Sequence, residues 1–524
     1  MPPQFHSLLR RIIMVAPVLA TLAFGCGDSS PATITRPTPL PFVPTNLDIP
    51  DEAELLEQID DALETKRGSK FDRDFDAIDP GELIEHATFS QFAIDELKPS
   101  PEELFLKGDE LFEYAFRLEN GLGNALAGVP GIRAGNLPAP NMRRVHKSDF
   151  GGPDSYSCAT CHSKGGPDGA GMNTQNAFLR GNGKNANTAD ERNAPHVLGL
   201  GPIEALAREM SGILVQQREQ GIARAKLEDK PQTIPLLAKG VRFGTLLVGS
   251  DGTVDTSNVA GIDPDLVVRP FGWKGHQASI RAMSQESFRI HLGMMSGYEQ
   301  QQMRDGKLDT KNYGNGIWFD TDRDNQHIEI DSGMLTSMVA YLSQLEVPVV
   351  RRPSDPELAK RFDRGKLLFS SIGCADCHKP SLTLNDPVLR LVPKDERFTQ
   401  RAPILIDVAH DGDEPKIQPN GDNGYQVNLF SDLKRYDMGE KLDSGYKQGH
   451  LPKSVFLTRP LWGLSDTAPF LHDGRAPTVH DAIVWHGGDA LVVRESYQAL
   501  DKSERDALLV FLLSLDRKPK LVVP

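Results

Sequence analysis

Apolar residues recur at helical spacing in two pairs of short stretches, one pair in each half of the chain. The first pair opens with Gly108-Asp-Glu-Leu-Phe112 and closes with Met338–Leu345; the second opens with Gly365-Lys-Leu-Leu-Phe369 and closes with Leu508–Leu515. The two closing stretches also carry an aromatic residue at the same position. Apolar residues every three or four positions lie on one face of a helix, and similar segments in two halves indicate an internal repeat. The pattern therefore predicts two helical domains of similar construction.

The segments between these stretches are expected to be mostly loops. Glycine and proline number 47 and 38 in the chain of 524 residues, and many of them fall between the predicted helices. Helices are predicted at 51–66 and 101–118 as well, where helix formers dominate. We therefore expect an N-terminal domain at 51–350, with a helical extension, and a C-terminal domain at 355–524. Both are expected to be mainly α, with long loop insertions and little sheet.

The first fifty residues have the features of an exported protein. Arg10 and Arg11 precede a short apolar run that ends at Phe24, so residues 1–25 are predicted to be a signal peptide. The run is shorter than the roughly 20 apolar residues that a transmembrane helix needs. Cys26 follows and is typical of a bacterial lipoprotein site, although an ordinary signal peptide that contains a cysteine stays open. Residues 26–50 are predicted to be a flexible tether, and the mature protein to lie in the periplasm or outer cell envelope.

Composition narrows the range of partners. Hydrophobic residues make up 39% and charged residues 25% of the chain, as in an ordinary globular protein. The net charge of −14 argues against nucleic acid, because phosphate binding requires a basic face. An acidic surface suits a basic protein partner, and it also suits solubility alone.

Four of the five cysteines fall into two C-x-x-C-H motifs, Cys158-Ala-Thr-Cys161-His162 and Cys374-Ala-Asp-Cys377-His378. This spacing allows two thiols to bond one porphyrin while the adjacent histidine binds its iron. A redox C-x-x-C pair or half of a zinc site is the alternative, but neither requires a following histidine in both copies. The sequence predicts two covalently bound haem c groups, with His162 and His378 as the proximal iron ligands.

The sixth ligand of each iron separates electron transfer from catalysis, because a firmly bound histidine or methionine closes the iron to small oxidants. For the second haem the candidates are His486 and, as the alternative, Met438. For the first haem several residues are eligible and none is favoured: His196, His276, His291, Met172 and Met294. The first iron is therefore expected to be open or weakly ligated.

Five segments together resemble the bacterial di-haem cytochrome c peroxidase superfamily, and most closely its branch of di-haem oxidoreductases. They are Arg269–Gln277, Phe430–Leu433 with Asp437–Gly439, Arg459–Gly463, Thr467–Arg475 and Ala482–Gly488. The resemblance implies two cytochrome c-like haem domains and reduction of peroxide. The peroxidases usually have methionine at the position of His486, and a histidine there implies a lower haem potential.

The resemblance also implies roles for residues outside the two motifs. Trp273 is the candidate for an aromatic residue between the haems, and Arg459 and Arg475 are candidates for pairing with haem propionates. Glu286 or His291 is the candidate for a proton shuttle on the distal side.

A calcium ion is a further expectation, because members of the peroxidase family can hold one between their domains. Asp320, Asp322 and Asp324, with Asp331 at the twelfth position, imitate an EF-hand loop, although its usual glycine and glutamate are replaced. An acidic loop that is only solvated is the alternative.

The function expected from these residues is a peroxidase-like oxidoreductase that passes electrons between its haems. Its partners would be a peroxide or another small oxidant and an electron-carrier protein, such as a small cytochrome or a cupredoxin. The first alternative is a non-catalytic electron-transfer cytochrome. The second is oxidation of a protein or small-molecule partner, which tryptophan-modifying relatives carry out.

Overall fold

The computed structural model describes ten stretches of the chain. They are residues 51–62, 90–117, 120–123, 145–146, 153–162, 176–307, 328–392, 402–411, 414–421 and 424–516. All of them belong to one compact unit, residues 34–524. The predicted signal peptide, the tether with Cys26, Met172 and the loop that holds Asp320, Asp322 and Asp324 lie outside the described residues.

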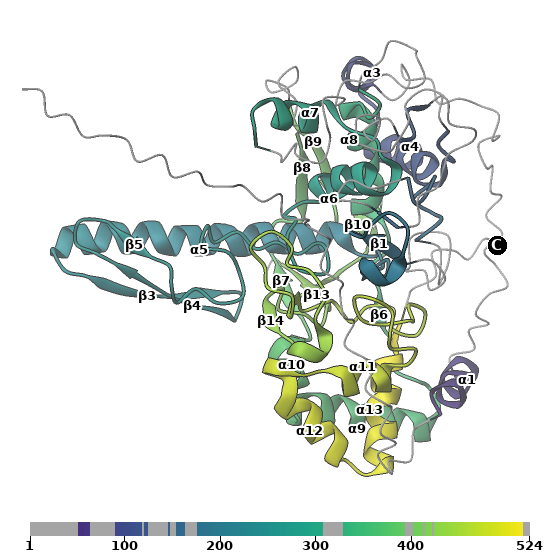
Figure 1. Cartoon of the computed structure of the whole chain (residues 1–524). Coiled ribbons are helices and arrows are strands. Elements are labelled where there is room, and N and C mark those ends of the chain that lie inside the picture. Colours follow the sequence, from purple (N-terminus) through teal and green to yellow (C-terminus); the bar gives the residue numbers. More distant parts are fainter. Residues whose placement is uncertain are drawn as a thin grey trace, which may run out of the picture. The chain divides into compact units, whose positions relative to one another are not determined.

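Helices make up most of the regular structure in the described residues (Figure 1). The α-helices are α1 (Glu52–Ala62), α3 (Gln91–Leu97), α4 (Pro101–Glu113), α5 (Leu200–Glu228), α6 (Ile280–Ser287), α7 (Gly297–Arg304), α8 (Ser332–Gln344), α9 (Pro356–Ser371), α10 (Cys374–Cys377), α11 (Val479–Trp485), α12 (Leu491–Ala499) and α13 (Lys502–Leu513). Three 3-10 turns, η3 (Ala186–Thr188), η6 (Glu440–Leu442) and η7 (Gly488–Ala490), and one π-helical turn, η4 (Phe288–Leu292), complete the set.

The strands are short and form seven sheets of two or three strands in the described part of the chain. They are β1 (Ala177–Leu179), β2 (Asp190–Arg192), β3 (Gln232–Ala238), β4 (Val241–Val248), β5 (Val254–Asp255), β6 (Val349–Val350), β7 (Leu382–Leu384), β8 (Val388–Leu391), β9 (Ile404–Asp407), β10 (His410–Asp411), β11 (Glu414–Pro415), β12 (Gln418–Pro419), β13 (Tyr425–Val427), β14 (Arg435–Asp437), β15 (Val455–Leu457) and β16 (Leu515–Asp516). Every pairing between these strands is antiparallel.

The internal repeat appears as two packed helix pairs, α4 with α8 and α9 with α13. The crossing points correspond: a Cβ atom at Gly108 would collide with the carbonyl of Ser337, and one at Gly365 would collide with the carbonyl of Ala507. Glycine at these two positions lets the helices approach until their backbones nearly touch. The predicted opening and closing helices of each half are confirmed.

Both opening helices begin at strong start signals. α4 has Ser100 as its N-cap with a complete capping box to Glu103, and proline occupies the first turn. In α9, Asp355 accepts hydrogen bonds from two backbone N–H groups and Pro356 begins the helix. These signals fix where each opening helix starts.

The buried apolar residues form two main clusters, one around each helix pair. The first joins α4, α8 and the inner half of α5, and it also includes residues between 382 and 462. The second joins α9, α13 and α1, with Leu55 and Ile59 of α1 among its members. Segments from each half of the sequence therefore contribute to the core of the other.

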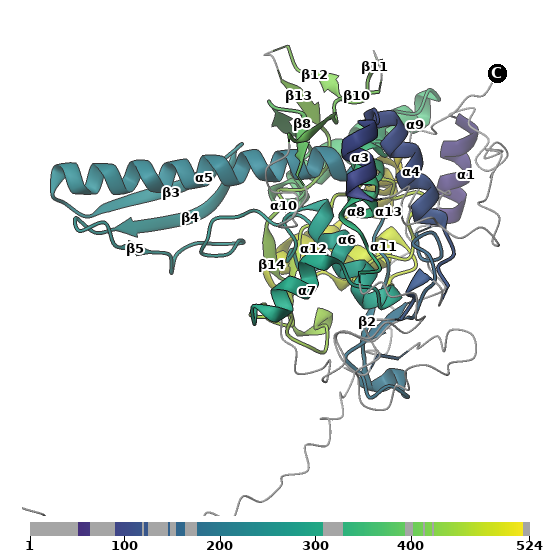
Figure 2. The ribbon, with the colours of Figure 1, turned by 90° about the horizontal axis from the view of Figure 1, so that it is seen from above.

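Two sequence predictions about regular structure are corrected. The helix predicted over 101–118 ends at Glu113, because Phe116 pairs its backbone N–H with the carbonyl of Tyr156, and Tyr114 and Phe116 pack in the first core. The insertion of the first half is not a long loop between 200 and 255. There α5 and the hairpin β3–β4, with β5 at its edge, form an arm that extends away from the helix pairs (Figures 1 and 2).

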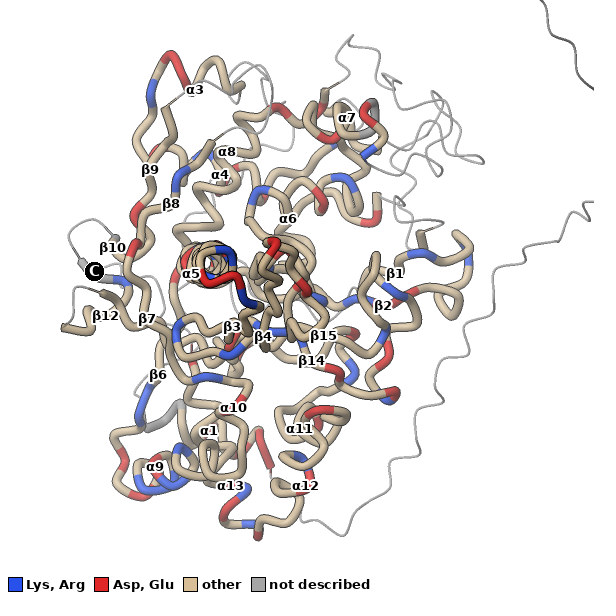
Figure 3. Tube along the Cα trace, turned by 90° about the vertical axis from the view of Figure 1, so that its left-hand side faces the viewer, with Lys and Arg blue, Asp and Glu red and all other residues tan. Residues whose placement is uncertain are grey.

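Charged residues of both signs are interspersed along the described trace (Figure 3). Within the same part of the chain, no helix combines the length and the apolar character that crossing a lipid bilayer would demand.

Candidate functional site

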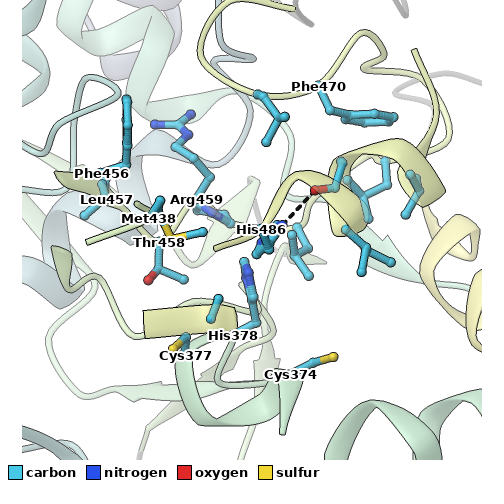
Figure 4. Close-up of a pocket in the computed structure, with 18 of the residues that line it drawn as sticks. Cys374, Cys377, His378, Met438, Phe456, Leu457, Thr458, Arg459, Phe470 and His486 are labelled. Atoms are coloured by element: carbon cyan, nitrogen blue, oxygen red, sulfur yellow. Dashed lines mark hydrogen bonds between the residues drawn. The ribbon is translucent and has the colours of Figure 1, made fainter. Parts of the chain in front are cut away.

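The second C-x-x-C-H motif lines a cavity of about 340 Å³ (Figure 4). Gly373 precedes α10 with a φ of 101°, so the chain turns sharply into this single helical turn. Residues three positions apart on a helix lie on the same face, and Cys374 and Cys377 both line the cavity. Apolar side chains form much of the remaining wall: Phe369, Phe456, Leu457, Leu461, Leu464, Phe470, Ile483 and Val493.

Two histidines from distant parts of the chain meet in this cavity. His378 follows α10 directly, and His486 is the residue at which α11 ends. Figure 4 draws their imidazoles next to one another, and His486 acts electrostatically on His378. Burial, followed by the influence of His486, lowers the pKa of His378 to about 4, and burial also lowers the pKa of His486. Both imidazoles are therefore neutral, the form that binds a metal ion.

The hydrogen bonds of the two imidazoles fix which nitrogen faces the cavity. Nδ1 of His378 lies 3.0 Å from the carbonyl oxygen of Phe430, and Nδ1 of His486 lies 2.7 Å from that of Ala482. A carbonyl oxygen only accepts, so both Nδ1 atoms carry the proton and both Nε2 atoms keep a lone pair. Backbone carbonyls commonly orient metal-bound histidines in this way. The pair is thus prepared to bind one metal ion between them.

Met438, the alternative ligand, lines the same cavity just after β14. The segment that follows His486 packs closely on its backbone: a Cβ atom at Gly488, whose φ is 52°, would collide with the carbonyl of Asp437. Glycine at position 488 is therefore required for His486 and Met438 to line one cavity.

The two predicted propionate partners differ in their surroundings. Arg459 lines the cavity with its guanidinium 5.4 Å from the ring centre of Trp273, and within the described residues it makes no side-chain hydrogen bond or ion pair. Burial lowers its pKa to about 10, which leaves it charged at neutral pH. Arg475 is occupied, because it binds Asp473 through Nε at 2.9 and 2.7 Å and donates to the carbonyl of Lys441. Arg459, unlike Arg475, is therefore available for an anion in the cavity.

These residues fit a covalently bound haem. The cavity offers two thiols on one face, two neutral imidazoles whose Nε2 atoms are unprotonated, mostly apolar walls, and the buried guanidinium of Arg459, which makes no side-chain hydrogen bond or ion pair within the described residues. Cavities that bind small molecules and cofactors typically have this combination of apolar walls and few polar groups.

The thiols themselves do not have the properties of a redox dithiol. Burial raises the pKa of Cys158 and of Cys374 to about 12, and that of Cys161 to about 11. Reactive C-x-x-C motifs depend on a lowered thiol pKa. The alternative of dithiol chemistry at these motifs is therefore disfavoured.

The first motif is surrounded by different chemistry. His162 lies below α4, with its ring centre 6.1 Å from that of Phe112. Burial lowers its pKa to about 4, and His291 adds to this effect. No second imidazole near His162 has its Nδ1 bound to a backbone carbonyl, among the residues that the structure describes.

A histidine–aspartate–histidine cluster lies near His162. Nδ1 of His291 lies 3.0 Å from Oδ1 of Asp154, and Nε2 of His146 lies 3.0 Å from Oδ2 of the same carboxylate. Burial would raise the pKa of Asp154, but the two histidines hold it below its usual range. Burial would likewise lower the pKa of His291, but the Asp154 carboxylate, aided by Glu286, raises it above its usual value.

The backbone explains how this cluster forms. His291 lies in the π-helical turn η4, a kind of turn that often marks functional sites. Its carbonyl accepts hydrogen bonds from the backbone N–H groups of Asp154 and Ser155, so the segment before Cys158 is fastened to this turn. The His291 side chain keeps 36% of its surface accessible, which leaves it open to a small molecule.

Glu286 lies in the same region, but its carboxylate is already paired with neighbouring side chains. Its Oε2 lies 2.6 Å from Nε2 of His276 and accepts a hydrogen bond from Gln277 at 2.9 Å. Burial opposes ionisation, yet His276 and then Arg289 lower the pKa of Glu286 to about 2. The structure thus brings Glu286 and His291 together, with His291 the more accessible of the two predicted shuttles.

Two other candidates for the sixth ligand of the first iron, Met294 and His196, lie in different parts of the structure. Met294 is fully buried in the first apolar core. His196 has both ring nitrogens buried and without a hydrogen-bond partner within the described residues. Burial, then Arg459 and more weakly His162, lower the pKa of His196, which also lines the cavity of the second motif. His196 therefore lies between the two motifs.

Trp273 also belongs to this intermediate region. It lines the cavity of the second motif, and its Nε1 donates a 2.8 Å hydrogen bond to the carbonyl of Asn193. Asn193 lies three residues before His196, so the indole is tied to the segment between the motifs.

Asp331 of the predicted calcium loop acts as a helix cap. Its Oδ1 accepts hydrogen bonds from Gly333 N, at the start of α8, and from Gln91 N. In the described parts of the chain, no group of three or more His, Cys, Asp or Glu side chains is arranged to hold a metal ion.

Asp154 and His146 were not predicted from the sequence. Asp154 lies four residues before Cys158, but nothing in its local pattern shows that it faces His291. The only signal would have been the pairing of the segment before the motif with the turn at His291, and this pairing uses backbone atoms alone.

Comparison with known proteins gives the following relations. Residues 406–515 match the family described as "Di-haem oxidoreductase, putative peroxidase". Among solved structures, the chain is similar to hydrazine synthase from Kuenenia stuttgartiensis, with 14% sequence identity, a TM-score of 0.30, and coverage of 73% of this chain and 90% of that one. It is also similar to a MauG-like protein associated with microbial copper homeostasis, with 15% identity, a TM-score of 0.24, and coverage of 51% and 77%. No curated protein matches the chain.

This match agrees with the family resemblance predicted from the sequence, and residues 406–515 are the segment that resembles a di-haem oxidoreductase. The match includes Met438, Arg459 and His486 and ends at residue 515, two residues after α13. It does not extend to either C-x-x-C-H motif.

Proposed function

We propose that this protein is an exported di-haem c-type cytochrome that reduces peroxide, with the second haem as the electron-transfer group and the first as the catalytic one. The observation that carries this proposal is the asymmetry between the two motifs. At the second, His378 and His486 line one cavity, and each holds its Nδ1 proton against a backbone carbonyl, so neither Nε2 is protonated. At the first, His162 is accompanied by an acid–base cluster instead.

At the second motif, His378 and His486 would be the ligands of the iron, and Cys374 and Cys377 would bind the porphyrin. Two strong nitrogen ligands close an iron to peroxide and favour electron transfer. Arg459 binds a propionate, because its guanidinium is buried in the cavity wall without another side-chain partner in the described residues.

At the first motif, Cys158 and Cys161 would hold the porphyrin and His162 would bind the iron. When bound, this haem supplies the site at which a peroxide O–O bond is reduced. His291 holds and delivers a proton through the nitrogen that Asp154 leaves free, and the Asp154 carboxylate keeps that imidazole protonated. Glu286 maintains His276 and Gln277 beside this group.

Between the motifs, Trp273 and the segment that contains Asn193 and His196 form the route for electrons. The indole is fixed at both of its ends, by the hydrogen bond to Asn193 and by the stacked guanidinium of Arg459. An aromatic ring held between two redox groups shortens the gap that an electron must cross.

The setting of the reaction is proposed from the sequence. The chain is exported to the periplasm or outer cell envelope, with a lipid anchor at Cys26, and receives electrons from a small cytochrome or cupredoxin. The partner would be basic, given the net charge of −14.

A visible absorption titration with stoichiometric hydrogen peroxide tests the proposal. It is run on the fully oxidised and on the half-reduced protein. We expect rapid Soret changes that reverse on adding reductant. These changes should persist in a His486→Ala variant, because His486 belongs to the second cavity and the first haem is the proposed site of reaction. An unchanged spectrum in both states would mean that both irons are closed, and the proposed activity would be wrong.

The second candidate is a non-catalytic electron carrier, and one observation favours it. His291 has its Nδ1 held by Asp154, so in the neutral form of the imidazole its Nε2 would carry a free lone pair, as that of His486 does. If His291 bound the first iron, both irons would be six-coordinate. A ferric spectrum that is entirely low-spin and unchanged by cyanide would support this function over the first.

A further inference from the structure

The N-terminal helix α1 makes an unusual contact with the helix that carries His486. Glu52, the first residue of α1, is only 8% exposed although it is a carboxylate. Its Oε2 accepts a 2.9 Å hydrogen bond from the backbone N–H of Val479, and its Oε1 accepts a 2.6 Å bond from that of His480. These two residues open α11 and are more than four hundred positions away in the sequence.

Glu52 thereby completes the capping of α11. The first N–H groups of a helix have no partner within the helix itself. Thr478 accepts the hydrogen bond from the third of them, Asp481 N, at 3.0 Å, and Glu52 accepts the first two. A carboxylate at this end also interacts favourably with the helix dipole. All three N–H groups of the first turn therefore depend on two side chains, one of which comes from α1.

α1 is held in place by its own apolar face. Leu55 and Ile59 are buried in the second core beside α13, and Ile59 is fully enclosed. α1 also approaches α9 through Gln58, which accepts a 3.5 Å hydrogen bond from Arg361. Figure 3 draws α1 next to α13 and α9, in agreement with these contacts.

The burial of Glu52 carries a cost that its position must offset. Desolvation raises the pKa of Glu52, whereas the hydrogen bonds from His480 and Val479 lower it again. A carboxylate that served only to make α1 soluble would have remained in water, as Glu54 and Glu57 do on the same helix. Here the carboxylate is inserted between α1 and α11 and bonded at both oxygens.

α11 spans only Val479–Trp485, so what fixes its first turn also fixes its last. His486 directly follows this helix, and its Nδ1 donates to the carbonyl of Ala482 within it. A second contact supports the first turn, since Nδ1 of His480 lies 2.7 Å from the hydroxyl of the buried Tyr497. The orientation of the His486 imidazole thus depends on α11 as a unit.

We infer that Glu52 is a positioning residue for His486, and that α1 acts as a strap that keeps the second cavity's distal imidazole in its binding orientation. This inference rests on the proposed role of His486 as an iron ligand. The strap contributes no atom to the cavity. It sets the ratio between the bound and the detached positions of His486 through the cap of α11.

The test uses the full-length holoprotein and the variants Glu52→Gln and Glu57→Gln. Both remove one negative charge from the same helix, but Glu57 is exposed and does not touch α11. We expect Glu52→Gln to shift the ratio of bound to detached His486 by about tenfold, the usual size of a lost charged cap. A high-spin ferric fraction and stronger cyanide binding at the second haem would report it, together with a higher midpoint potential. Glu57→Gln should match the parent protein.

Two further variants keep the outcomes distinct. Thr478→Ala removes the other cap of α11 and should change the same spectra in the same direction, whereas Glu52→Asp should restore part of the parent signal. His486→Ala defines the spectrum of the detached state. If His486→Ala leaves the spectrum unchanged, the proposed ligand is wrong. If His486→Ala changes it but Glu52→Gln, still folded by circular dichroism, matches the parent, the positioning role of Glu52 is wrong.

Discussion

The two halves of this protein share a helix pair and a C-x-x-C-H motif but differ in what surrounds the histidine. Each motif follows an opening helix that crosses its closing helix at a glycine, Gly108 in one half and Gly365 in the other. Near His378 the chain places a second neutral imidazole, and near His162 it places a charged acid–base cluster. The two halves therefore share the helix pair and the motif, whereas the side chains near the motif histidine differ.

The physical origin of the difference is the partner of each Nδ1 atom. In the second cavity a backbone carbonyl accepts the proton of His486; this bond alone would raise the pKa of the imidazole, but burial outweighs it and lowers the pKa. In the first site the carboxylate of Asp154 accepts it from His291 and raises the pKa of that imidazole. The same side chain is thus prepared to bind metal in one place and to donate a proton in the other.

The largest expected effect comes from removing His291, the proposed proton donor near the first motif. His291→Ala should lower peroxide turnover by about 10²–10⁴, the usual contribution of a positioned acid–base group. The spectrum of the second haem should not change. Stopped-flow peroxide reduction and ferric absorption spectra measure both properties. Met294→Leu, a buried change in the first core, is the control and should retain turnover. Equal turnover in His291→Ala and the parent would remove His291 from the mechanism.

The next effect tests whether the two helix pairs are equivalent in energy. A methyl group at Gly108 or Gly365 would overlap a backbone carbonyl of the facing helix, which cannot rotate away. Gly108→Ala and Gly365→Ala should each destabilise the protein by about 1–3 kcal/mol, the usual cost of overpacking. Chemical unfolding followed by circular dichroism measures the loss.

Gly212→Ala in α5 is the matched control for these two variants. A Cβ atom there would have no neighbour within 4 Å. The variant should gain up to about 1 kcal/mol from better helix propensity. If Gly108→Ala and Gly365→Ala behaved like Gly212→Ala, the two helix crossings would not be as close as the structure has them.

The helix pairs could be predicted from the sequence because their signals are local. Apolar spacing, the caps at Ser100 and Asp355, and the repeated glycine all lie within single helices. The arm could not be predicted in this way. In its outer half, α5 packs small residues such as Gly221 and Ala225 against the hairpin and leaves Leu227 87% exposed, so no apolar stripe marks the helix.

In the candidate site, too, the residues with a local sequence signal could be predicted and the others could not. The motif residues and His486 could be predicted from their spacing and from the family resemblance. The carbonyls that orient the two imidazoles belong to Phe430 and Ala482, and a backbone acceptor leaves no trace in the choice of side chain. Asp154 and Glu52 were missed for a related reason, since the partners of each carboxylate lie far away in the sequence and local spacing does not show them.

The smallest expected effect is a shift in the pH dependence of peroxide reduction when Asp154 is changed. The Asp154 carboxylate raises the pKa of His291, so the protonated form needed for proton delivery persists below that raised pKa and is lost as the pH rises through it. In Asp154→Asn the main raising charge is gone and burial lowers the pKa, so the falling limb of kcat/KM should move to lower pH. Asp386→Asn removes an exposed carboxylate that pairs with Arg390 and should leave the limb in place. A limb that stays fixed in Asp154→Asn would mean that another group delivers the proton. The two histidines would then differ in position only, because the partner of Nδ1 would have no consequence for the reaction.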